Sequence, residues 1–324
     1  MKAILLGLVS ALFFAITFVL NRSMELSGGS WIWSASLRYL FMLPMLLLLV
    51  LPQRKLFPLL HVMRERPGMW VLWSLVGFGL FYIPICMASA YSPGWLVAGT
   101  WQLTIICGSL LAPLFWVTVP GQGGLIRTRG MIPLKGLFMS LLILLGVVLM
   151  QLEQARTIPF SHLLWGTLPI IIAAFAYPLG NRKMMELTGG RLDALQRVLG
   201  MTLASLPLWV ILSGFGIAAA GLPSREQVMQ SVLVALFSGV VATVLFFKAT
   251  DMAQGSMHKL GAVEATQSME VLFALAGELI ILNAPLPSLL SWIGMGIVII
   301  GMVLHSTVPH KKPGPVSANE RHVS

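Results

Sequence analysis

Long apolar runs alternate with short polar segments along almost the whole chain. Each run holds about 20 residues, which is the length an α-helix needs to cross the hydrocarbon core of a bilayer. The apolar residues within a run are continuous, whereas a membrane β-strand alternates apolar and polar positions. The pattern therefore predicts an all-α polytopic membrane protein with ten transmembrane helices. The runs lie at about 3–20, 31–51, 69–90, 93–118, 132–151, 163–180, 192–213, 227–249, 258–282 and 288–305.

One polar segment occurs twice, about half a chain apart. Asn21–Gly29 reads NRSMELSGG, and Asn181–Gly190 reads NRKMMELTGG, with one inserted residue. Each copy follows an apolar run and precedes another run that carries an arginine near its start, Arg38 or Arg197. Similarity at a fixed spacing of this size indicates a duplicated domain.

The number of runs in each half determines how the two copies enter the membrane. Five is odd, so the second half is expected to have the opposite orientation to the first, as in transporters with inverted repeats. We therefore expect a five-helix repeat at 1–152, an inverted five-helix repeat at 160–305 and a disordered cytoplasmic tail at 306–324.

Composition supports a membrane protein. Hydrophobic residues make up 57% of the chain and charged residues only 10%, against roughly 25% charged residues in soluble domains. The two cysteines, Cys86 and Cys107, both lie in apolar runs, which predicts neither a disulfide framework nor a metal site. No cofactor is expected.

The basic residues predict the orientation. If the N-terminus is cytoplasmic, 16 lysines and arginines fall in inside segments and 3 in outside segments. This asymmetry predicts a multi-pass protein of the cell membrane with both termini in the cytoplasm. The net charge of +10 is spread over many loops rather than gathered in one patch, which argues against nucleic acid as a partner.

Several segments resemble the drug/metabolite transporter superfamily, in its ten-span branch with two EamA-type domains. They are Ser10–Ala15, Asn21-Arg22 and Ser36–Leu40 in the first half, and Ala174–Tyr177, Asn181-Arg182 and Leu195–Leu199 in the second. The stretch Ala88–Gln102 resembles the multidrug-resistance efflux (EmrE-like) subgroup. The resemblance implies an alternating-access carrier with a central cavity. The four-span relatives couple drugs to protons through a glutamate in the first span, which holds no acid here.

Candidate coupling groups lie in the ninth run, which contains Glu264, Glu270 and Glu278. An ionisable side chain at the centre of a bilayer is costly and is a functional candidate by default. Our hypothesis is that Glu270, together with Glu264, faces the cavity and binds a proton or a cationic substrate. The alternative is a structural carboxylate paired with an arginine or lysine.

Candidate substrate-binding residues are aromatic or carry an amide. Trp101 and Gln102 lie near the middle of the fourth run, and Gln267 takes the matching place in the ninth. Aromatic faces attract cations, so these residues predict a small cationic or aromatic substrate. The alternative is packing in the core or against lipid. Further candidates are Tyr82, Tyr91 and Tyr177, whose side chains carry an aromatic ring and a hydroxyl group.

Four further residues are candidates for gating. Arg38 and Arg197 lie a short way into their runs, where they could pair with a carboxylate or an anionic substrate, or else reach the headgroups. Asn21 and Asn181 would be the hinges of two gates. The alternative is that the Asn-Arg pairs simply end the first and sixth helices.

These observations favour secondary-active, proton-coupled efflux of drugs or small metabolites. An exporter of amino acids or other neutral metabolites is the alternative. An intramembrane enzyme is not expected, because no His-Glu-x-x-His or Gly-x-Ser-x-Gly motif is present. A receptor is less favoured because the chain offers no sizeable soluble domain. The sequence does not fix the oligomeric state.

Overall fold

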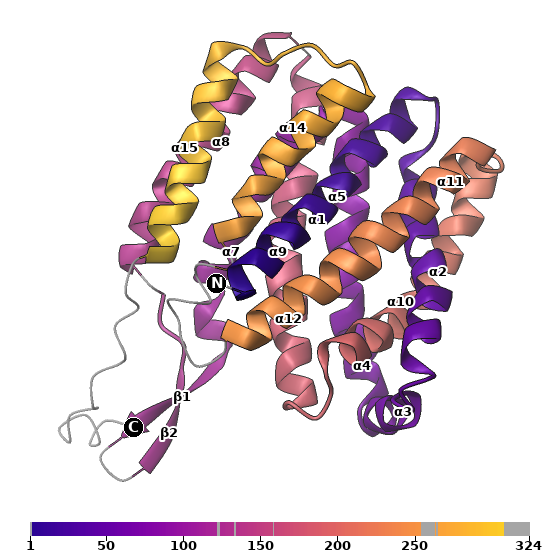
Figure 1. Ribbon diagram of the computed structural model, residues 1–324, viewed down its shortest axis with the longest axis vertical. Coiled ribbons are helices and arrows are strands. Elements are labelled where there is room, and N and C mark those ends of the chain that lie inside the picture. The colour runs from indigo at the N-terminus through magenta and orange to yellow at the C-terminus, as the bar shows by residue number, and fades with distance from the viewer. Residues whose placement is uncertain are drawn as a thin grey trace.

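The computed structural model describes residues 2–121, 124–132, 134–157, 159–253, 263 and 265–307. Helices dominate these residues (Figure 1). The first half contains α1 (Lys2–Leu26), α2 (Trp31–Val50), α3 (Leu56–Glu65), α4 (Pro67–Ser74), η1 (Leu75–Gly79), α5 (Leu80–Tyr91), α6 (Gly94–Trp101), α7 (Thr104–Leu110), η2 (Ala112–Leu114), β1 (Trp116–Gly121), β2 (Gly124–Arg129) and α8 (Leu134–Thr157). The second half contains α9 (Phe160–Thr188), α10 (Ala194–Ala220), α11 (Arg225–Val234), η3 (Ala235–Ala242), α12 (Thr243–Ala253), η4 (Thr266–Ser268), α14 (Met269–Ile281) and α15 (Leu289–Thr307).

Seven helical segments in the described residues are long and apolar enough to cross a membrane. They are Lys2–Leu26, Trp31–Val50, Pro67–Tyr91, Gly136–Arg156, Phe160–Thr188, Ala194–Ala220 and Arg225–Ala253. Leu289–His305 is apolar but shorter. The expected fourth run is an interrupted helix, and the described part of the ninth contains the 3₁₀ turn η4 before α14. The architecture of ten spans in two repeats therefore stays a prediction.

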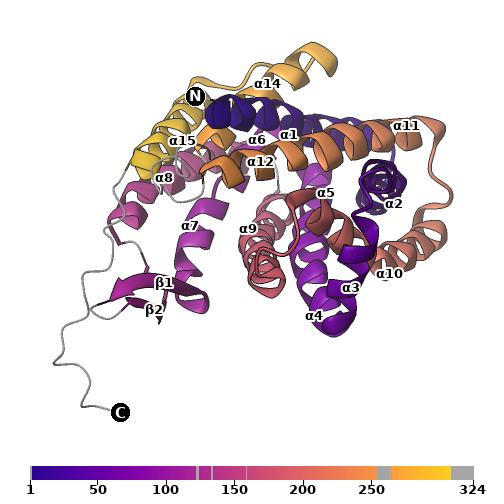
Figure 2. The same cartoon turned by 60° about the horizontal axis from the view of Figure 1, so that its bottom comes forward.

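A β-hairpin corrects the all-α prediction. The fourth run was expected to extend to residue 118, but α7 ends at Leu110 and β1 pairs antiparallel with β2, from Trp116↔Arg129 to Gly121↔Gly124. Pro113 follows the helix end, and the next residues include β-branched ones, which favour an extended backbone. The hairpin projects from the helical body (Figure 2).

Two of the long helices contain a π-helical segment. In the third run η1 lies between α4 and α5, and in the eighth run η3 lies between α11 and α12. Such segments replace the i→i−4 hydrogen bonds locally and occur frequently at functional sites. Each segment contains a glycine that meets a methionine: a Cβ on Gly77 would lie 3.0 Å from Met201 Cε, and one on Gly239 would lie 2.5 Å from Met42 Sδ.

A seam between α2 and α10 joins the two halves. The helices run antiparallel, because Trp33 lies against Gly216 near one end of the seam and Tyr39 stacks on Trp209 in the middle, with ring centroids 4.2 Å apart. At the other end the Lys55 ammonium lies 2.7 Å from the Asp193 carboxylate. Contacts between the two halves therefore extend from one end of this seam to the other in this conformation.

A second antiparallel pair, α8 and α15, lies at one edge of the molecule (Figure 1). Gly146 allows the backbones to meet, since a Cβ there would lie 2.6 Å from the Gly294 carbonyl oxygen. His305 Nδ1 lies 2.7 Å from Ser140 Oγ within the same interface. Small residues in such interfaces allow helices to approach closely in a bilayer.

Asp193 begins α10 and also closes the α2–α10 seam. Its carboxylate accepts a hydrogen bond from the Gln196 amide at 2.9 Å, and Gln196 Oε1 accepts one from the Asp193 amide, which together form a capping box. Partial burial alone would raise the pKa of Asp193, but the hydrogen bonds from Lys55 and Gln196 outweigh it and the pKa lies below its usual range.

Asp193 should therefore contribute to the stability of the protein in two separable ways, as the cap of α10 and as the ion-pair partner of Lys55. We expect Asp193→Ala to cost about 1 kcal/mol through the lost cap, and Asp193→Asn to cost less because an amide oxygen can still cap. A carboxylate with a lowered pKa stabilises the fold above its usual pKa, and that contribution is lost as the pH falls through the folded-state value. Thermal unfolding of the wild type and of Asp193→Asn in detergent, at neutral pH and at about pH 3, would measure this contribution. If the difference in unfolding temperature between the two proteins were as large at pH 3 as at neutral pH, the ion pair would be contradicted.

Candidate functional site

Glu270 lies in the first turn of α14, against α6. The two helices run antiparallel: Gly94 lies beside Glu278, a Cβ on Gly99 would lie 3.7 Å from Val271, and Gln102 contacts Gln267. The tightest contacts of these two glycines are with other helices, since a Cβ would lie 2.6 Å from the Phe18 carbonyl oxygen of α1 at Gly94 and 2.2 Å from Met150 Cε of α8 at Gly99. The register brings the end of α6 to the level of Glu270.

The Glu270 carboxyl group is buried without a partner. The residue is 3% exposed, and its Oε2 atom has no hydrogen-bond partner in the described part of the chain. No lysine, arginine or histidine there lies within 4.0 Å of its oxygens. The alternative in which Glu270 forms a structural ion pair is therefore wrong for this conformation, within the described residues. Glu264 lies outside them.

Gln102 and Gln267 meet where their two helices are interrupted. Gln102 lies between α6 and α7, and its Nε2 donates to Ala98 O at 3.1 Å and to Gln267 O at 3.4 Å. Gln267 lies in the 3₁₀ turn η4, and its Nε2 donates to Gly7 O at 3.2 Å. Interrupted helices at the middle of a membrane transporter typically carry its binding site.

Aromatic side chains gather beside this crossing. Phe81 of α5 lies at the centre: its ring centroid is 4.7 Å from that of Tyr177, 5.1 Å from that of Trp101 and 5.9 Å from that of Tyr82. Trp101 and Tyr177 also contact each other edge to face, at 5.5 Å. We call Phe81, Tyr82, Trp101 and Tyr177 the aromatic cluster. Tyr91 is not part of it and packs on His162 instead.

The sequence singled out three members of the cluster but not Phe81. A phenylalanine in an apolar run has no polar group to distinguish it from core residues. Its position next to Tyr82, at the face where α5 meets α9, could be found only from the packing of these two helices (Figure 2).

Arg38 contacts the cluster from α2. Its side chain is only 4% exposed, and the guanidinium carbon lies 4.0 Å from the centroid of the Tyr82 ring. Its terminal nitrogen donates to Ser238 Oγ at 3.2 Å, while Nε has no hydrogen-bond partner. No carboxylate of the described residues lies within 4.0 Å of it. The prediction that Arg38 could reach the headgroups is wrong, because the side chain turns into the core.

Arg197 has a different environment from Arg38, its counterpart in the first half of the chain. One of its terminal nitrogens lies 3.9 Å from the Asp251 carboxylate, and its guanidinium lies 5.6 Å from the Phe247 ring. It therefore has a carboxylate near it, whereas Arg38 has none within 4.0 Å in the described part of the chain. Of the two repeated arginines, only Arg38 joins the aromatic cluster.

The Asn-Arg pairs do not end their helices, which corrects that alternative. The helix α1 continues to Leu26 and α9 continues to Thr188, because the following residues favour helix and positive-φ glycines come only after them. Asn21 lies inside α1 and donates to the Tyr82 hydroxyl at 3.3 Å. Asn181 lies inside α9, and its two buried amide atoms have no hydrogen-bond partner among the described residues.

The arginines that follow these asparagines each donate to a backbone carbonyl group near the end of another helix. Arg22 donates to the carbonyl oxygen of Ser89 at 3.1 Å, in the last turn of α5. Arg182 donates to the carbonyl oxygen of Gly108 at 2.8 Å, near the end of α7. The sequence marked the repeat but not this role, which depends on a third helix.

Glu278 caps the start of α6. Its two carboxylate oxygens accept hydrogen bonds from the amide of Gly94 at 2.7 Å and of Trp95 at 3.3 Å. The first amides of a helix have no partner within it, so a carboxylate there is stabilising. Glu270 and Glu278 thus share one helix, but only Glu278 has its oxygens satisfied.

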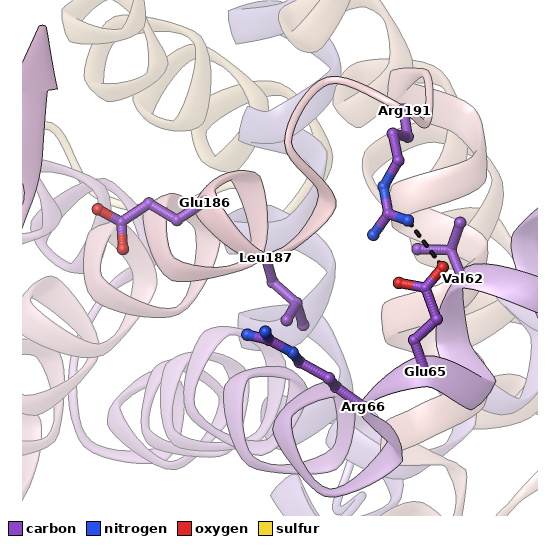
Figure 3. A pocket seen from close by; sticks show the side chains of 6 residues that line it. All are labelled: Val62, Glu65, Arg66, Glu186, Leu187 and Arg191. Carbon is purple, nitrogen blue, oxygen red and sulfur yellow. Dashed lines mark hydrogen bonds and ion pairs between the residues drawn. The ribbon is translucent and has the colours of Figure 1, made fainter.

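A surface pocket lies elsewhere, between α3 and the turn after α9 (Figure 3). It has a volume of about 250 Å³ and shares no residue with the aromatic cluster. Arg191 donates to Glu65 there at 2.7 Å, and this hydrogen bond lowers the pKa of Glu65. The other lining residues are Val62, Arg66, Glu186 and Leu187. The pocket bridges the two halves at one end of the helices and holds none of the predicted site residues.

Comparisons with known proteins bear on the whole chain. A family model described as "EmrE: Putative multidrug resistance efflux transporter" matches residues 1–311. The "Uncharacterized protein YjlA" of Bacillus subtilis (strain 168) is 56% identical over 306 residues, which is 94% of each chain. The "Uncharacterized 42.1 kDa protein in intracellular alkaline protease 3'region" of Shouchella clausii is 51% identical over 271 residues, covering 83% of this chain and 70% of its own.

A solved structure titled "Crystal structure of protein" has a similar fold. It superposes with a TM-score of 0.61 at 14% sequence identity, and the match covers 93% of this chain and 95% of the other. At this identity the similarity concerns the fold alone.

Proposed function

Because the chain belongs to the EmrE family of multidrug-resistance efflux transporters, we propose that it exports a small cationic or aromatic molecule in exchange for protons, by alternating access. It is a multi-pass membrane protein of the drug/metabolite transporter type. Transport rather than catalysis is the activity that this family implies. The basic loops favour an orientation with both termini in the cytoplasm, and the description of the family as efflux transporters favours export across the cell membrane.

The proposal includes ten spans in two inverted repeats, 1–152 and 160–305. Matched packing supports it: Gly77 meets Met201, and Gly239 meets Met42, so a glycine in the π-helical segment of each half contacts a methionine of the other half. The two methionines are separated along the chain by nearly the same interval as the two Asn-Arg pairs. Repeats that contact each other reciprocally can exchange conformations, which opens a carrier to either side in turn.

The single observation that carries the coupling proposal is the buried carboxyl group of Glu270, whose Oε2 atom has no hydrogen-bond partner among the described residues. A buried carboxylate without a partner is costly, whereas a protonated carboxyl group or one bound to a cation is much less so. A group of this kind binds either a proton or a cationic substrate but not both. That competition is the requirement for exchange of protons against a substrate.

Flux measurements test this proposal directly. The purified full-length protein would be placed in liposomes with an imposed pH gradient, and accumulation of ethidium, a cationic aromatic probe, and of phenylalanine would be measured. We expect the gradient to drive accumulation of at least one probe, without chemical change, and a protonophore to abolish it. Accumulation of neither probe above protein-free liposomes would refute proton-coupled export.

A further inference from the structure

The short helix α3 lies across one end of the helical body. Helix α2 ends at Val50, and Arg54 in the turn that follows has a positive φ of 54°, after which α3 begins at Leu56. With 10 residues α3 is too short to cross a bilayer, which takes about 20. Figure 1 shows α3 almost end-on below α2, so its axis runs across the direction of that span. We therefore place α3 where α2 leaves the hydrocarbon, at the level of the lipid headgroups.

The two faces of α3 differ in character. Leu59 is fully buried and packs on α10, where a Cβ on Gly200 would lie 2.9 Å from its Cδ1 atom. On the outward face, Phe57 is 81% exposed, and His61 and Arg64 are exposed as well. An α-helix advances about 100° per residue, which places these three residues within about 60° of one another. The outward face therefore combines an exposed phenyl ring with basic side chains.

Three arginines of this segment have no acidic partner. Arg54, Arg64 and Arg66 are all exposed, and none forms a hydrogen bond or an ion pair within 4.0 Å with a described residue. In Figure 3 the Arg66 guanidinium lies beside the apolar side chain of Leu187. The segment thus presents three positive charges that this part of the chain leaves without a counterion.

The remaining charged residues of the segment are occupied in contacts with the second half of the chain. The Lys55 ammonium lies 2.7 Å from the Asp193 carboxylate, and the Glu65 carboxylate lies 2.7 Å from Arg191. The only carboxylate of α3 is therefore engaged by another arginine. These ion pairs also mean that a molecule bound to α3 binds the element through which the two halves meet at this end.

We propose that α3 is an interfacial helix whose outward face binds anionic phospholipids, with Arg54, Arg64 and Arg66 holding headgroup phosphates and Phe57 packing among acyl chains. Guanidinium groups bind phosphate through paired hydrogen bonds, and helices that lie in the interface combine basic residues with bulky apolar ones. In the proposed orientation this face meets the cytoplasmic leaflet, which carries anionic lipids. The lipid is neither the transported molecule nor the coupling ion, so this role goes beyond the proposed function.

Lipid binding to the purified full-length protein in a neutral detergent tests the proposal. Phosphatidylglycerol and phosphatidylcholine with the same short acyl chains would be compared through the rise in unfolding temperature that each produces. We expect phosphatidylglycerol to bind at least about tenfold more tightly, because each arginine near a negative headgroup contributes about a fivefold gain. High salt should reduce this preference, since the arginines are exposed.

Matched variants separate the contributions of charge and of the phenyl ring. Arg64→Gln should weaken phosphatidylglycerol binding about fivefold and leave phosphatidylcholine binding unchanged. Arg225→Gln is the control, because Arg225 is also exposed but begins α11 at the other end of the molecule, beside the start of α2; it should leave both lipids unaffected. Phe57→Ser should weaken both lipids by a similar factor and keep the preference between them.

Several outcomes would overturn the inference. Equal binding of the two lipids to the wild type would do so, as would an equal loss of preference in Arg64→Gln and Arg225→Gln, which would show an effect of net charge alone. Inorganic phosphate that stabilises the protein as strongly as phosphatidylglycerol would assign the arginines to a free anion. A dimer in detergent that dissociates in Phe57→Ser would assign the face to a second copy of the chain. No pH gradient enters these measurements, so their result is independent of proton-coupled export.

Discussion

Liposomes that contain the Glu270→Gln variant should show no accumulation driven by a pH gradient, with flux falling to the level of protein-free liposomes. Glutamine keeps the shape of the side chain but cannot exchange a proton, so the competition between proton and substrate disappears. The variant should unfold at the same temperature as the wild type or a higher one, because a buried group that has no partner among the described residues has lost its charge. Loss of function with retained or increased stability is the pattern typical of functional sites.

Glu278→Gln is the matched control, since both glutamates lie in α14 and both are buried. The Glu278 carboxylate accepts hydrogen bonds from the amides of Gly94 and Trp95. Glutamine retains only one acceptor oxygen and no charge, so this variant should lose about 1–2 kcal/mol of stability but keep flux coupled to the pH gradient. Coupled flux that survives in Glu270→Gln and disappears in Glu278→Gln would contradict the assignment of the two roles.

The helical composition of the fold could be predicted because the bilayer imposes a simple rule on sequence. A helix that crosses the hydrocarbon core must be apolar for its whole length, and this pattern is legible without any tertiary contact. The interruption at Gln102 and the π-helical segments η1 and η3 left no such signal. They depend on which helix packs against which, as the contact of Gly77 with Met201 illustrates.

Helix ends were predicted less well, for a reason visible at Asn21 and Asn181. A polar pair after an apolar run marks where a helix leaves the hydrocarbon, but it does not mark where the helix stops. The helices α1 and α9 continue past the pairs to Leu26 and Thr188, and the left-handed residues Gly28 and Gly189 follow. Hydropathy indicates where a helix leaves the hydrocarbon, whereas capping residues indicate where the helical backbone ends.

The sequence predicted which residue types form the candidate site better than it predicted how these residues are arranged in space. Glu270 and Trp101 stood out because charge and aromatic rings are conspicuous in apolar runs, and the structure brings both to the same crossing of α6 and α14. Arg38 stood out too, but its position near the start of a run suggested the headgroups. Its burial against Tyr82 follows from the packing of α2 on α5, which no local pattern encodes.

Gly180→Ala should be among the most destabilising single substitutions in the chain, because α9 meets the π-helical segment η1 at this residue. A Cβ on Gly180 would lie 2.3 Å from both the Cα and the N atom of Gly77, and 2.9 Å from the carbonyl oxygen of Trp73. These are backbone atoms, which cannot rotate away as a side chain would. We expect a loss of about 1–3 kcal/mol, the range typical of overpacking, seen as a lower unfolding temperature in detergent.

Gly214→Ala supplies the control for this prediction, since it makes the same change inside a long helix, α10, where no atom lies within 4 Å of the added Cβ. Alanine is intrinsically the better helix former by about 1 kcal/mol, so Gly214→Ala should leave the unfolding temperature unchanged or raise it. The opposite signs of the two variants isolate the contact between Gly77 and Gly180 from helix propensity. If Gly180→Ala proved as stable as Gly214→Ala, the close approach of α9 to η1 would be wrong, and with it the packing that positions Tyr177 beside Phe81.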